Sequence, residues 1–351
     1  MKYGIITYTS AQNWGGILQA YALKKYLSDI GVDIELINYR AFDSRWFKPR
    51  KQLKDIIFSI LKYSECKNRI ESYECFRKQY MGLDGPVFTT HEELKTLNSV
   101  YDAFITGSDQ LWNCETEICY DFYLDFVQDS KKKLAYGPSF GQDKIPEQFE
   151  QEVTRLLKRY DVKSVRERSG QRIVERLTGE KIQVVCDPTF LLSAEQWDSV
   201  RNKHIDESNY IFIYTTQVSG RVVELVKAYK SQHSSVRIIT PYALPGIKAE
   251  VKKDIGPAEF LSYIKNADYV IGTSFHAVVF SLIFHRDFCV VPHSSTGARV
   301  NDLLGSLGLE DHLIGLEFDG VFPFINVDYQ CKLDEVIRDS KQYLNSILKK
   351  E

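Results

Sequence analysis

The residue best placed for acid–base chemistry in this 351-residue chain is His276, which lies between a short apolar run and a longer one. Residues 269–271 predict a buried strand, and residues 275–284 have the apolar density of a buried helix. We therefore expect His276 in the first turn of a helix, just beyond the carboxyl end of a strand, where open parallel α/β sheets bind ligands. That helix start, with Thr273 or Ser274 as N-cap, would offer backbone N–H groups to an anion. The alternative is a histidine that is only hydrogen-bonded beneath a loop.

Length and composition indicate a globular protein of two domains. The chain is 44% hydrophobic and 13% aromatic, and its formal net charge of -2 argues against a nucleic-acid-binding protein that relies on a basic surface. No apolar run approaches the roughly 18–20 residues that span a bilayer. Because Met1 and Lys2 lead directly into a strand-like run, we expect no signal peptide and a cytoplasmic protein.

The seven cysteines are scattered and form no C-x-x-C pair. This pattern favours neither a zinc site nor a disulfide framework. No group of carboxylates or histidines has the spacing of metal ligands, so we expect no metal.

The N-terminal residues predict a βαβ unit. Residues 2–8 and 32–39 resemble strands, and an amphipathic helix between them ends at Gly31. Gly15 and Gly16 lack the G-x-G-x-x-G spacing of a dinucleotide site. They either let the strand turn tightly into the helix or form a loop that cradles a ligand.

Further strands end in polar turns, and the pattern restarts in the second half of the chain. The strand-like runs lie within residues 101–106, 131–141, 162–170, 183–192, 208–216 and 236–242. Their alternation with helical runs predicts two Rossmann-like, doubly wound α/β lobes.

We expect the following domain limits. Residues 1–195 form an N-terminal lobe with a helical insertion at about 41–98, and 205–328 form a C-terminal lobe that contains His276. The polar stretch 196–207 links the lobes, and a terminal helix within 329–351 packs back on the first lobe.

Residues 41–80 carry ten Lys or Arg against five Asp or Glu, and apolar residues recur there at helical spacing. A basic amphipathic helix of this kind could rest on an anionic membrane surface, at the inner face of the membrane. The alternative is a helical insertion packed on its own domain.

Four blocks in order along the chain resemble the polysaccharide pyruvyl transferase family. They are NWGGILQAYAL, FITGSDQLWN, SVRERSG followed by DPTFLL, and ADYVIGTSFHAVVFSLIF with Arg299 downstream. The resemblance implies two facing lobes with a cleft between them, similar to glycosyltransferase-B enzymes. It also implies transfer of a pyruvyl group from phosphoenolpyruvate, as co-substrate and without another cofactor, to a sugar diol of a capsular or exopolysaccharide repeat. The acceptor would be a sugar or a polyprenyl-linked oligosaccharide, and the product a cyclic ketal.

The donor side implied by this chemistry centres on His276 as general acid or base. Contacts to the donor carboxylate and phosphate would come from Thr273, Ser274, Phe275, Arg299 and Arg166. Many relatives carry an arginine immediately before the motif histidine or two residues before it, where this chain has Phe275 and Ser274. The cationic contact must then come from elsewhere, with Arg299 the first candidate and Arg166 or Arg168 the next.

The acceptor side would be lined by residues of the first lobe, namely Asn13, Gly15, Gly16, Gln19, Ser108, Gln110 and Trp112. Asp109 could deprotonate a sugar hydroxyl, or it could cap the next helix. Trp112 could equally belong to the core.

Two other functions remain open. The same two-lobe fold could serve a glycosyltransferase that uses a nucleotide sugar, although no decisive glutamate for the ribose stands out. The chain could also be a non-catalytic carbohydrate-binding protein of a polysaccharide assembly complex, because fold alone does not fix function.

Overall fold

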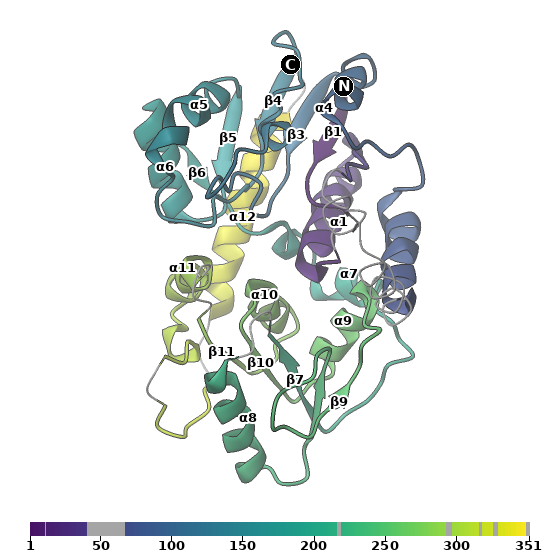
Figure 1. The fold of residues 1–351 in the computed structure, drawn as a ribbon, viewed down its shortest axis with the longest axis vertical. Coiled ribbons are helices and arrows are strands. Elements are labelled where there is room, and N and C mark those ends of the chain that lie inside the picture. The colour runs from purple at the N-terminus through teal and green to yellow at the C-terminus, as the bar shows by residue number, and fades with distance from the viewer. Residues whose placement is uncertain are drawn as a thin grey trace, which may run out of the picture. The chain divides into compact units, whose positions relative to one another are not determined.

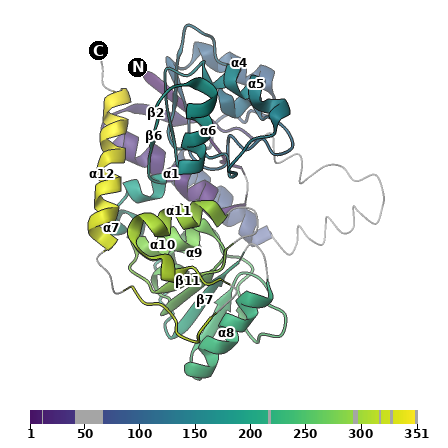
Figure 2. The ribbon, with the colours of Figure 1, turned by 90° about the vertical axis from the view of Figure 1, so that its left-hand side faces the viewer.

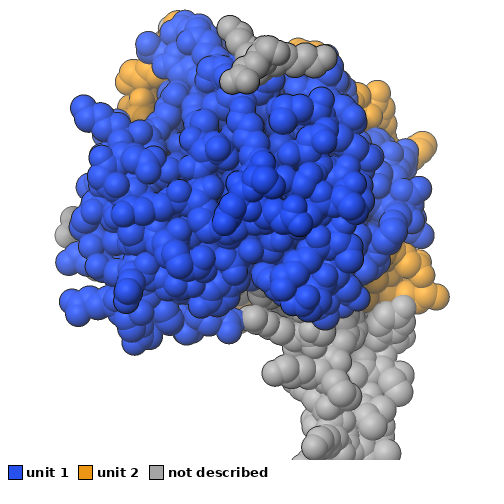
Figure 3. All heavy atoms as spheres, turned by 90° about the horizontal axis from the view of Figure 1, so that it is seen from above, with its two compact units in different colours: residues 1–49, 77–192, 333–351 blue, residues 50–76, 193–332 orange. Residues whose placement is uncertain are grey.

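A computed structural model describes residues 1–10, 12–40, 67–215, 219–292, 297–315, 318–325 and 329–348. The chain divides into two compact units, which Figure 3 colours separately. Unit 1 comprises Met1–Pro49, Arg77–Leu192 and Leu333–Glu351, and unit 2 comprises Arg50–Phe76 and Ser193–Lys332.

Unit 1 contains a six-stranded parallel sheet in the order β2-β1-β3-β4-β5-β6 (Figure 1). Its strands are β1 Lys2–Ile6, β2 Asp33–Leu36, β3 Ala103–Thr106, β4 Lys132–Ala135, β5 Val162–Val165 and β6 Gln183–Val184. All four residues of β3 are buried, as expected for a central strand covered on both faces.

The helices of unit 1 follow the capping signals of the sequence. Asn13 caps α1 by accepting a hydrogen bond from the Gly16 N–H, and the helix ends just before Gly31, whose φ of 84° suits glycine. The α-helices are α1 Trp14–Asp29, α4 His91–Lys95, α5 Glu147–Leu157 and α6 Arg168–Thr178. Shorter helical turns are η1 Arg77–Met81, η2 Thr96–Ser99, η3 Tyr120–Tyr123 and η4 Pro188–Leu191.

Unit 2 contains a five-stranded parallel sheet in the order β11-β10-β7-β8-β9. Its strands are β7 Tyr210–Tyr214, β8 Arg237–Thr240, β9 Glu250–Val251, β10 Tyr269–Gly272 and β11 Phe288–Val290. Its helices are α7 Ala194–Asp198, α8 Gly220–Gln232, α9 Pro257–Lys265, α10 Phe275–Ile283, α11 Gly297–Leu307 and the short η5 Glu310–His312, and residues 67–76 are also helical.

Helix α10 is buried along its whole length, because apolar side chains surround it on several sides. It packs against α9, α11, β10 and β11. On another side, the Trp197 ring meets Phe280 edge-on at 5.0 Å between ring centroids. An apolar helix is therefore stable here without a polar face, as the sequence analysis expected.

Both sheets reverse their strand order at their first strand. Strand β1 lies between β2 and β3, and β7 lies between β8 and β10. In such doubly wound sheets the helical connections that follow the two central strands run over opposite faces of the sheet. Ligands bind in the crevice outside the carboxyl ends of these two strands. The predicted fold class is confirmed, and each unit has a switch point of its own.

The structure differs from the expected domain limits in two places. The stretch 196–207 contains part of α7, and Trp197 is fully buried in unit 2, so this stretch is not a simple polar linker. Residues 67–76 are grouped with unit 2, whereas the sequence analysis places the insertion 41–98 with the first lobe.

Most of the basic segment 41–80 lies outside the described residues, since the description resumes at residue 67. Contact of this segment with a membrane stays a prediction. No helix in the described ranges is both long and apolar enough to cross a membrane.

Helix α12, Tyr329–Leu348, contacts the sheet of unit 1 through residues after position 332. Figure 2 shows α12 beside the strands and α1 of unit 1. The Tyr343 hydroxyl donates to the Ala135 carbonyl at 3.0 Å, and the Lys341 ammonium lies over the Tyr26 ring of α1 at 5.4 Å. Ser340 is buried, and its Oγ accepts a 2.8 Å hydrogen bond from the Cys186 N–H beyond β6. The C-terminal helix thus completes the fold of unit 1.

The buried Cys186–Ser340 hydrogen bond gives a stability prediction. Ser340→Ala leaves the Cys186 N–H unsatisfied in the core, so we expect a loss of about 1–3 kcal/mol in the free energy of unfolding. Ser346→Ala is the matched control, because Ser346 lies on the same helix but is exposed. Urea unfolding followed by circular dichroism measures both variants. Equal stability of the two would contradict the proposed importance of this contact.

Candidate functional site

The switch point of unit 1 is held together by buried polar side chains. Thr7, just after β1, donates from Oγ1 to the Ser108 carbonyl at 2.9 Å, which ties β1 to the turn after β3. Gln19 of α1 donates from Nε2 to Thr7 Oγ1 at 2.8 Å. Ser108 is fully buried, and its Oγ donates to the Gly137 carbonyl after β4 at 2.8 Å. These bonds fix the loops from which the chemical groups project.

Asp109 occupies a strained backbone conformation at this edge. Its φ is 83°, in the left-handed region that side chains disfavour. The strain is held by hydrogen bonds from the N–H groups of Leu111 and Ser139 to the Asp109 carbonyl, at 2.7 and 2.8 Å. Asp109 Oδ1 accepts from the adjacent Gln110 N–H at 2.9 Å, and no helix follows. The helix-capping interpretation of Asp109 is therefore wrong, and strain of this kind is typical of functional sites.

Asp109 forms an ion pair with a buried arginine. Arg166, beyond β5, has a side chain that is only 2% exposed, and it forms ion pairs with Asp187 and, at 3.5 Å, with Asp109. Asp187 is itself fixed by the Thr189 N–H and hydroxyl, at 3.0 and 2.7 Å. Burial would lower the pKa of Arg166, but the surrounding carboxylates outweigh it and raise that pKa. The charge of Arg166 is thus permanent, and it orients the Asp109 carboxylate.

The start of α1 lies beside this carboxylate. A Cβ added at Gly16 would lie 3.5 Å from Asp109 Oδ2, so glycine lets the backbone of the first helical turn come close to the acid. Gly15 and Gly16 are buried, whereas the N-cap Asn13 is exposed. The double glycine therefore serves a close approach as well as a turn.

The switch point of unit 2 is built in a similar way around β7 and β10. The hydroxyls of Thr215 and Thr273 lie 3.2 Å apart, and the Thr273 N–H donates to the Tyr214 carbonyl at 3.1 Å. Ser274 is the N-cap of α10, as one of the two expected candidates, but its side chain makes no capping hydrogen bond. His276 follows in the first turn and is 6% exposed.

Phe275 brings His276 and Arg299 into one cluster. The Arg299 guanidinium lies over the Phe275 ring at 5.6 Å, and the same ring meets the His276 imidazole edge-on at 5.3 Å. Arg299 comes from the first turns of α11, some twenty residues after His276. Unit 2 therefore places a fixed cation, an imidazole and the N-terminus of a nine-residue helix together, which suits an anionic ligand.

The model of the family described as polysaccharide pyruvyl transferase matches residues 13–295, which is most of the chain. The chain belongs to the polysaccharide pyruvyl transferase family. A search among curated proteins finds no match. The matched range includes Asn13 and Asp109 of unit 1 and His276 of unit 2, whereas Thr7 and Arg299 lie outside it. Membership supports a transferase of polysaccharide biosynthesis.

Solved structures with a similar fold are enzymes of the glycosyltransferase-B type. The UDP-GlcNAc 2-epimerase from Methanocaldococcus jannaschii has a TM-score of 0.54 and 13% identity, covering 96% of this chain and 92% of the other. The putative UDP-N-acetylglucosamine 2-epimerase from Listeria monocytogenes has a TM-score of 0.51 and 9% identity, covering 97% and 89%. The enzyme from Neisseria meningitidis bound to UDP-GlcNAc has a TM-score of 0.51 and 9% identity, covering 98% and 92%. At these identities the likeness shows the fold alone.

Most of the predicted site residues lie in one of two groups, one in each unit. Unit 1 gathers Asn13, Gly15, Gly16, Gln19, Ser108, Asp109, Gln110 and Arg166, and unit 2 gathers Thr273, Ser274, Phe275, His276 and Arg299. Arg166 thus lies with the expected acceptor residues and not with the expected donor residues. Their substrate-binding roles stay predictions.

Trp112 belongs to the core, as the second interpretation of it held. Its ring is fully buried, stacks on Tyr123 with 5.6 Å between centroids, and also contacts Phe140 and Tyr160. A side chain buried in this way cannot form a surface on which a sugar ring stacks.

Two acidic residues were not singled out from the sequence. Glu167 is buried, and its Oε1 accepts from the Phe140 N–H at 3.2 Å; Asp187, the first residue of the DPTFLL block, is buried in its ion pair with Arg166. The position of Asp187 directly after a short strand was the one available signal. Despite these carboxylates, no group of three or more residues in the described ranges could hold a metal ion.

The buried Arg166 ion pairs give a second prediction. Arg166→Leu leaves Asp187 and Asp109 buried without their cation, so we expect about 3–5 kcal/mol of destabilisation. Arg168→Leu is the control, because Arg168 is two residues away and exposed. Thermal and urea unfolding measure the difference. A variant at Arg166 that is as stable as the control would show that these carboxylates do not depend on the arginine.

Proposed function

We propose that the protein transfers the pyruvyl group of phosphoenolpyruvate to two hydroxyls of a sugar, forms a cyclic ketal and releases phosphate. The acceptor is a sugar of a polysaccharide repeat unit, either free or carried on a polyprenyl chain. Family membership supports pyruvyl transfer in polysaccharide biosynthesis. The observation that carries the proposal is the cluster of His276 and Arg299 at the start of α10, beyond the carboxyl end of β10.

The reaction has steps that require an acid, a base and fixed positive charge. Protonation of the methylene carbon of phosphoenolpyruvate makes its C2 electrophilic, and a sugar hydroxyl adds to C2 and loses its proton. The second hydroxyl then displaces phosphate from C2, and its proton leaves with the phosphate or to a base. The products are a methyl-bearing ketal carbon and inorganic phosphate, so atoms and charges balance. His276 supplies the proton to the methylene carbon, because an imidazole exchanges protons near neutral pH.

Arg299 and the α10 N-terminus support binding of the donor anion. The stacking of Arg299 on Phe275 holds a guanidinium beside His276, and a guanidinium is the side-chain group that binds a carboxylate through paired N–H donors. An arginine on a neighbouring helix thereby replaces the arginine that many relatives carry in the motif itself. Phe275 then acts through this stacking, not through a charge.

Asp109 suits the hydroxyl acceptor. Its carboxylate is held by Arg166 and by the Gln110 N–H, so it is oriented before any substrate binds. Nearby, Gln19 Oε1 and Gln110 Nε2 are buried, and no described residue forms a hydrogen bond with either atom. Buried polar atoms usually have a partner, and sugar hydroxyls or ordered water would provide one. We assign Asp109 the role of accepting the proton of the first hydroxyl.

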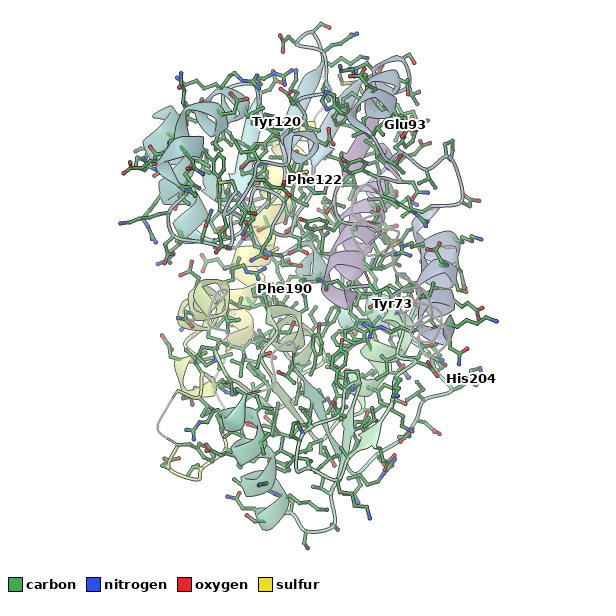
Figure 4. The ribbon with its side chains drawn as sticks, viewed as in Figure 1. Tyr73, Glu93, Tyr120, Phe122, Phe190 and His204 are labelled. Atoms are coloured by element: carbon green, nitrogen blue, oxygen red, sulfur yellow. The ribbon has the colours of Figure 1, made fainter. Side chains whose placement is uncertain are left out.

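The role of His276 is tested by replacing it with glutamine. Phosphate release from phosphoenolpyruvate is measured with a panel of methyl hexopyranosides as acceptors. We expect His276→Gln to lower kcat about 10²–10⁴-fold, the usual contribution of a general acid, with little change in the Kd for phosphoenolpyruvate. His204→Gln is the control, because His204 is exposed in the same unit (Figure 4). Full activity of His276→Gln would refute the role, and a wild type that leaves phosphoenolpyruvate intact but releases nucleoside diphosphate from a nucleotide sugar would point to a glycosyltransferase.

The role of Asp109 is tested with Asp109→Asn, which keeps the shape of the side chain and removes its basicity. In the same assay we expect kcat to fall about 10²-fold or more, while the melting temperature changes little in comparison with Arg166→Leu. Asp84→Asn is the control, since Asp84 is exposed in unit 1. An Asp109→Asn enzyme with normal kcat would exclude Asp109 as the base.

A further inference from the structure

A second arginine in unit 2 lies among aromatic side chains from three parts of the chain. Arg69 belongs to the helical residues 67–76, and its Nη2 donates to the Tyr242 hydroxyl at 3.4 Å. Its guanidinium lies 5.8 Å from the centre of the Tyr242 ring and 5.9 Å from that of Tyr73. The side chain is half-buried, and the sequence analysis did not single it out.

This arginine lies at the same edge of the sheet as the His276 cluster. Tyr242 follows β8 by two residues, and its N–H donates to Thr240 Oγ1 at 3.2 Å. Tyr73 lies near enough to Tyr214, the last residue of β7, that ionisation of Tyr214 would raise the pKa of Tyr73, and the Tyr214 carbonyl accepts from the Thr273 N–H ahead of α10. The order β10-β7-β8 therefore places β8, which leads to Tyr242, two strand spacings, about 10 Å, from the strand that leads to His276.

The helix that carries Arg69 is firmly seated on unit 2. Asn68 donates from Nδ2 to Asp254 at 3.2 Å, and the Ser72 side chain packs closely against Gly256, the N-cap of α9. Tyr73 is fully buried (Figure 4). Arg69 therefore projects from a fixed support, although it lies about two hundred residues before His276 in the sequence.

The surroundings of Arg69 keep it charged. Burial would lower the pKa of Arg69, but Tyr73 and Tyr242 outweigh that and raise it. Burial in turn raises the pKa of Tyr73 well above its usual value, so this phenol is neutral at neutral pH. A guanidinium that lies beside two phenol rings and donates to one of their hydroxyls has the chemistry of a site for a phosphate group.

We propose that Arg69, with the Tyr242 hydroxyl, binds a phosphate group at the carboxyl edge of the unit 2 sheet. The identification of this group as the phosphate of phosphoenolpyruvate rests on the proposed function. The proposal that Arg69 and Tyr242 form an anion site does not depend on that function. The assignment divides the two anionic groups of phosphoenolpyruvate: Arg299 and the α10 N-terminus take the carboxylate, and Arg69 and Tyr242 take the phosphate. With Arg69 at the phosphate and Arg299 at the carboxylate, no further cationic residue in the sequence motif around His276 is needed.

The test uses Arg69→Met, Arg69→Lys and Tyr242→Phe in the full chain. Titration calorimetry measures the Kd of each variant for phosphoenolpyruvate, inorganic phosphate and UDP. We expect Arg69→Met to weaken binding of the phosphate-bearing probes about 10- to 100-fold, the usual value of a charged hydrogen bond, and Arg69→Lys to weaken it less. Lys67→Met is the matched control: it removes a charge from the same helix at an exposed position, and we expect wild-type affinity.

The outcomes separate this site from the proposed reaction. Phosphate or UDP binding that depends on Arg69, together with an absence of phosphoenolpyruvate binding, supports the anion site and refutes the pyruvyl donor. Wild-type affinity of Arg69→Lys and Tyr242→Phe for every probe overturns the anion site, as does a wild type that binds none of the three. If Arg69→Met only lowers the melting temperature and leaves every Kd unchanged, Arg69 is a support for the helix and the proposal is wrong.

Discussion

The reversal of strand order at β1 and at β7 is the constraint on which both candidate clusters depend. Parallel strands point their carboxyl ends to one edge, and at the reversal the connecting helices leave opposite faces, so the loops there are not covered by a helix of their own sheet. In unit 1 the loops after β1 and β3 are joined by Thr7 and Ser108, and in unit 2 those after β7 and β10 are joined by Thr215 and Thr273. In both units buried hydroxyls therefore fix the backbone where substrate groups would bind.

The two edges differ in the sign of most of their buried charges, although in unit 1 the buried Arg77 also donates to the Thr9 and Ser10 carbonyls after β1. The buried ionisable groups after β3, β5 and β6 of unit 1 are three carboxylates around Arg166, which leaves an excess of negative charge. At the edge of unit 2, Arg69 and Arg299 are held on aromatic rings, and His276 lies against the same Phe275 as Arg299. Carboxylates suit a neutral, hydroxyl-rich acceptor that must lose protons, whereas guanidinium groups suit an anionic donor. This contrast supports the proposed placement of the acceptor at unit 1 and of the donor at unit 2.

The sequence predicted the elements with strong local signals and missed groups formed by distant residues. A helix is predicted over residues 275–284, and α10 spans Phe275–Ile283, because a dense apolar run of this length favours a buried helix. The position of His276 followed from its neighbours in the chain. By contrast, no local pattern connects Arg166 with Asp187 and Asp109, or Arg69 with Tyr242, since the folded sheets alone bring them together. Trp112 had a local environment compatible with two roles, and only its burial decides between them.

The aromatic support of the unit 2 arginines has a consequence for specificity. A guanidinium held by a carboxylate is partly neutralised, and an incoming anion must compete with that partner. A guanidinium held on a ring keeps its full charge and its planar donor edge while losing little side-chain freedom on binding. Phe275 and Tyr242 therefore help to orient Arg299 and Arg69 without adding a negative charge of their own, a property suited to a small donor with two anionic groups. Asp109 has the opposite requirement: its partner Arg166 is buried behind it, so the carboxylate is oriented from the inside and its outer oxygen remains near the start of α1.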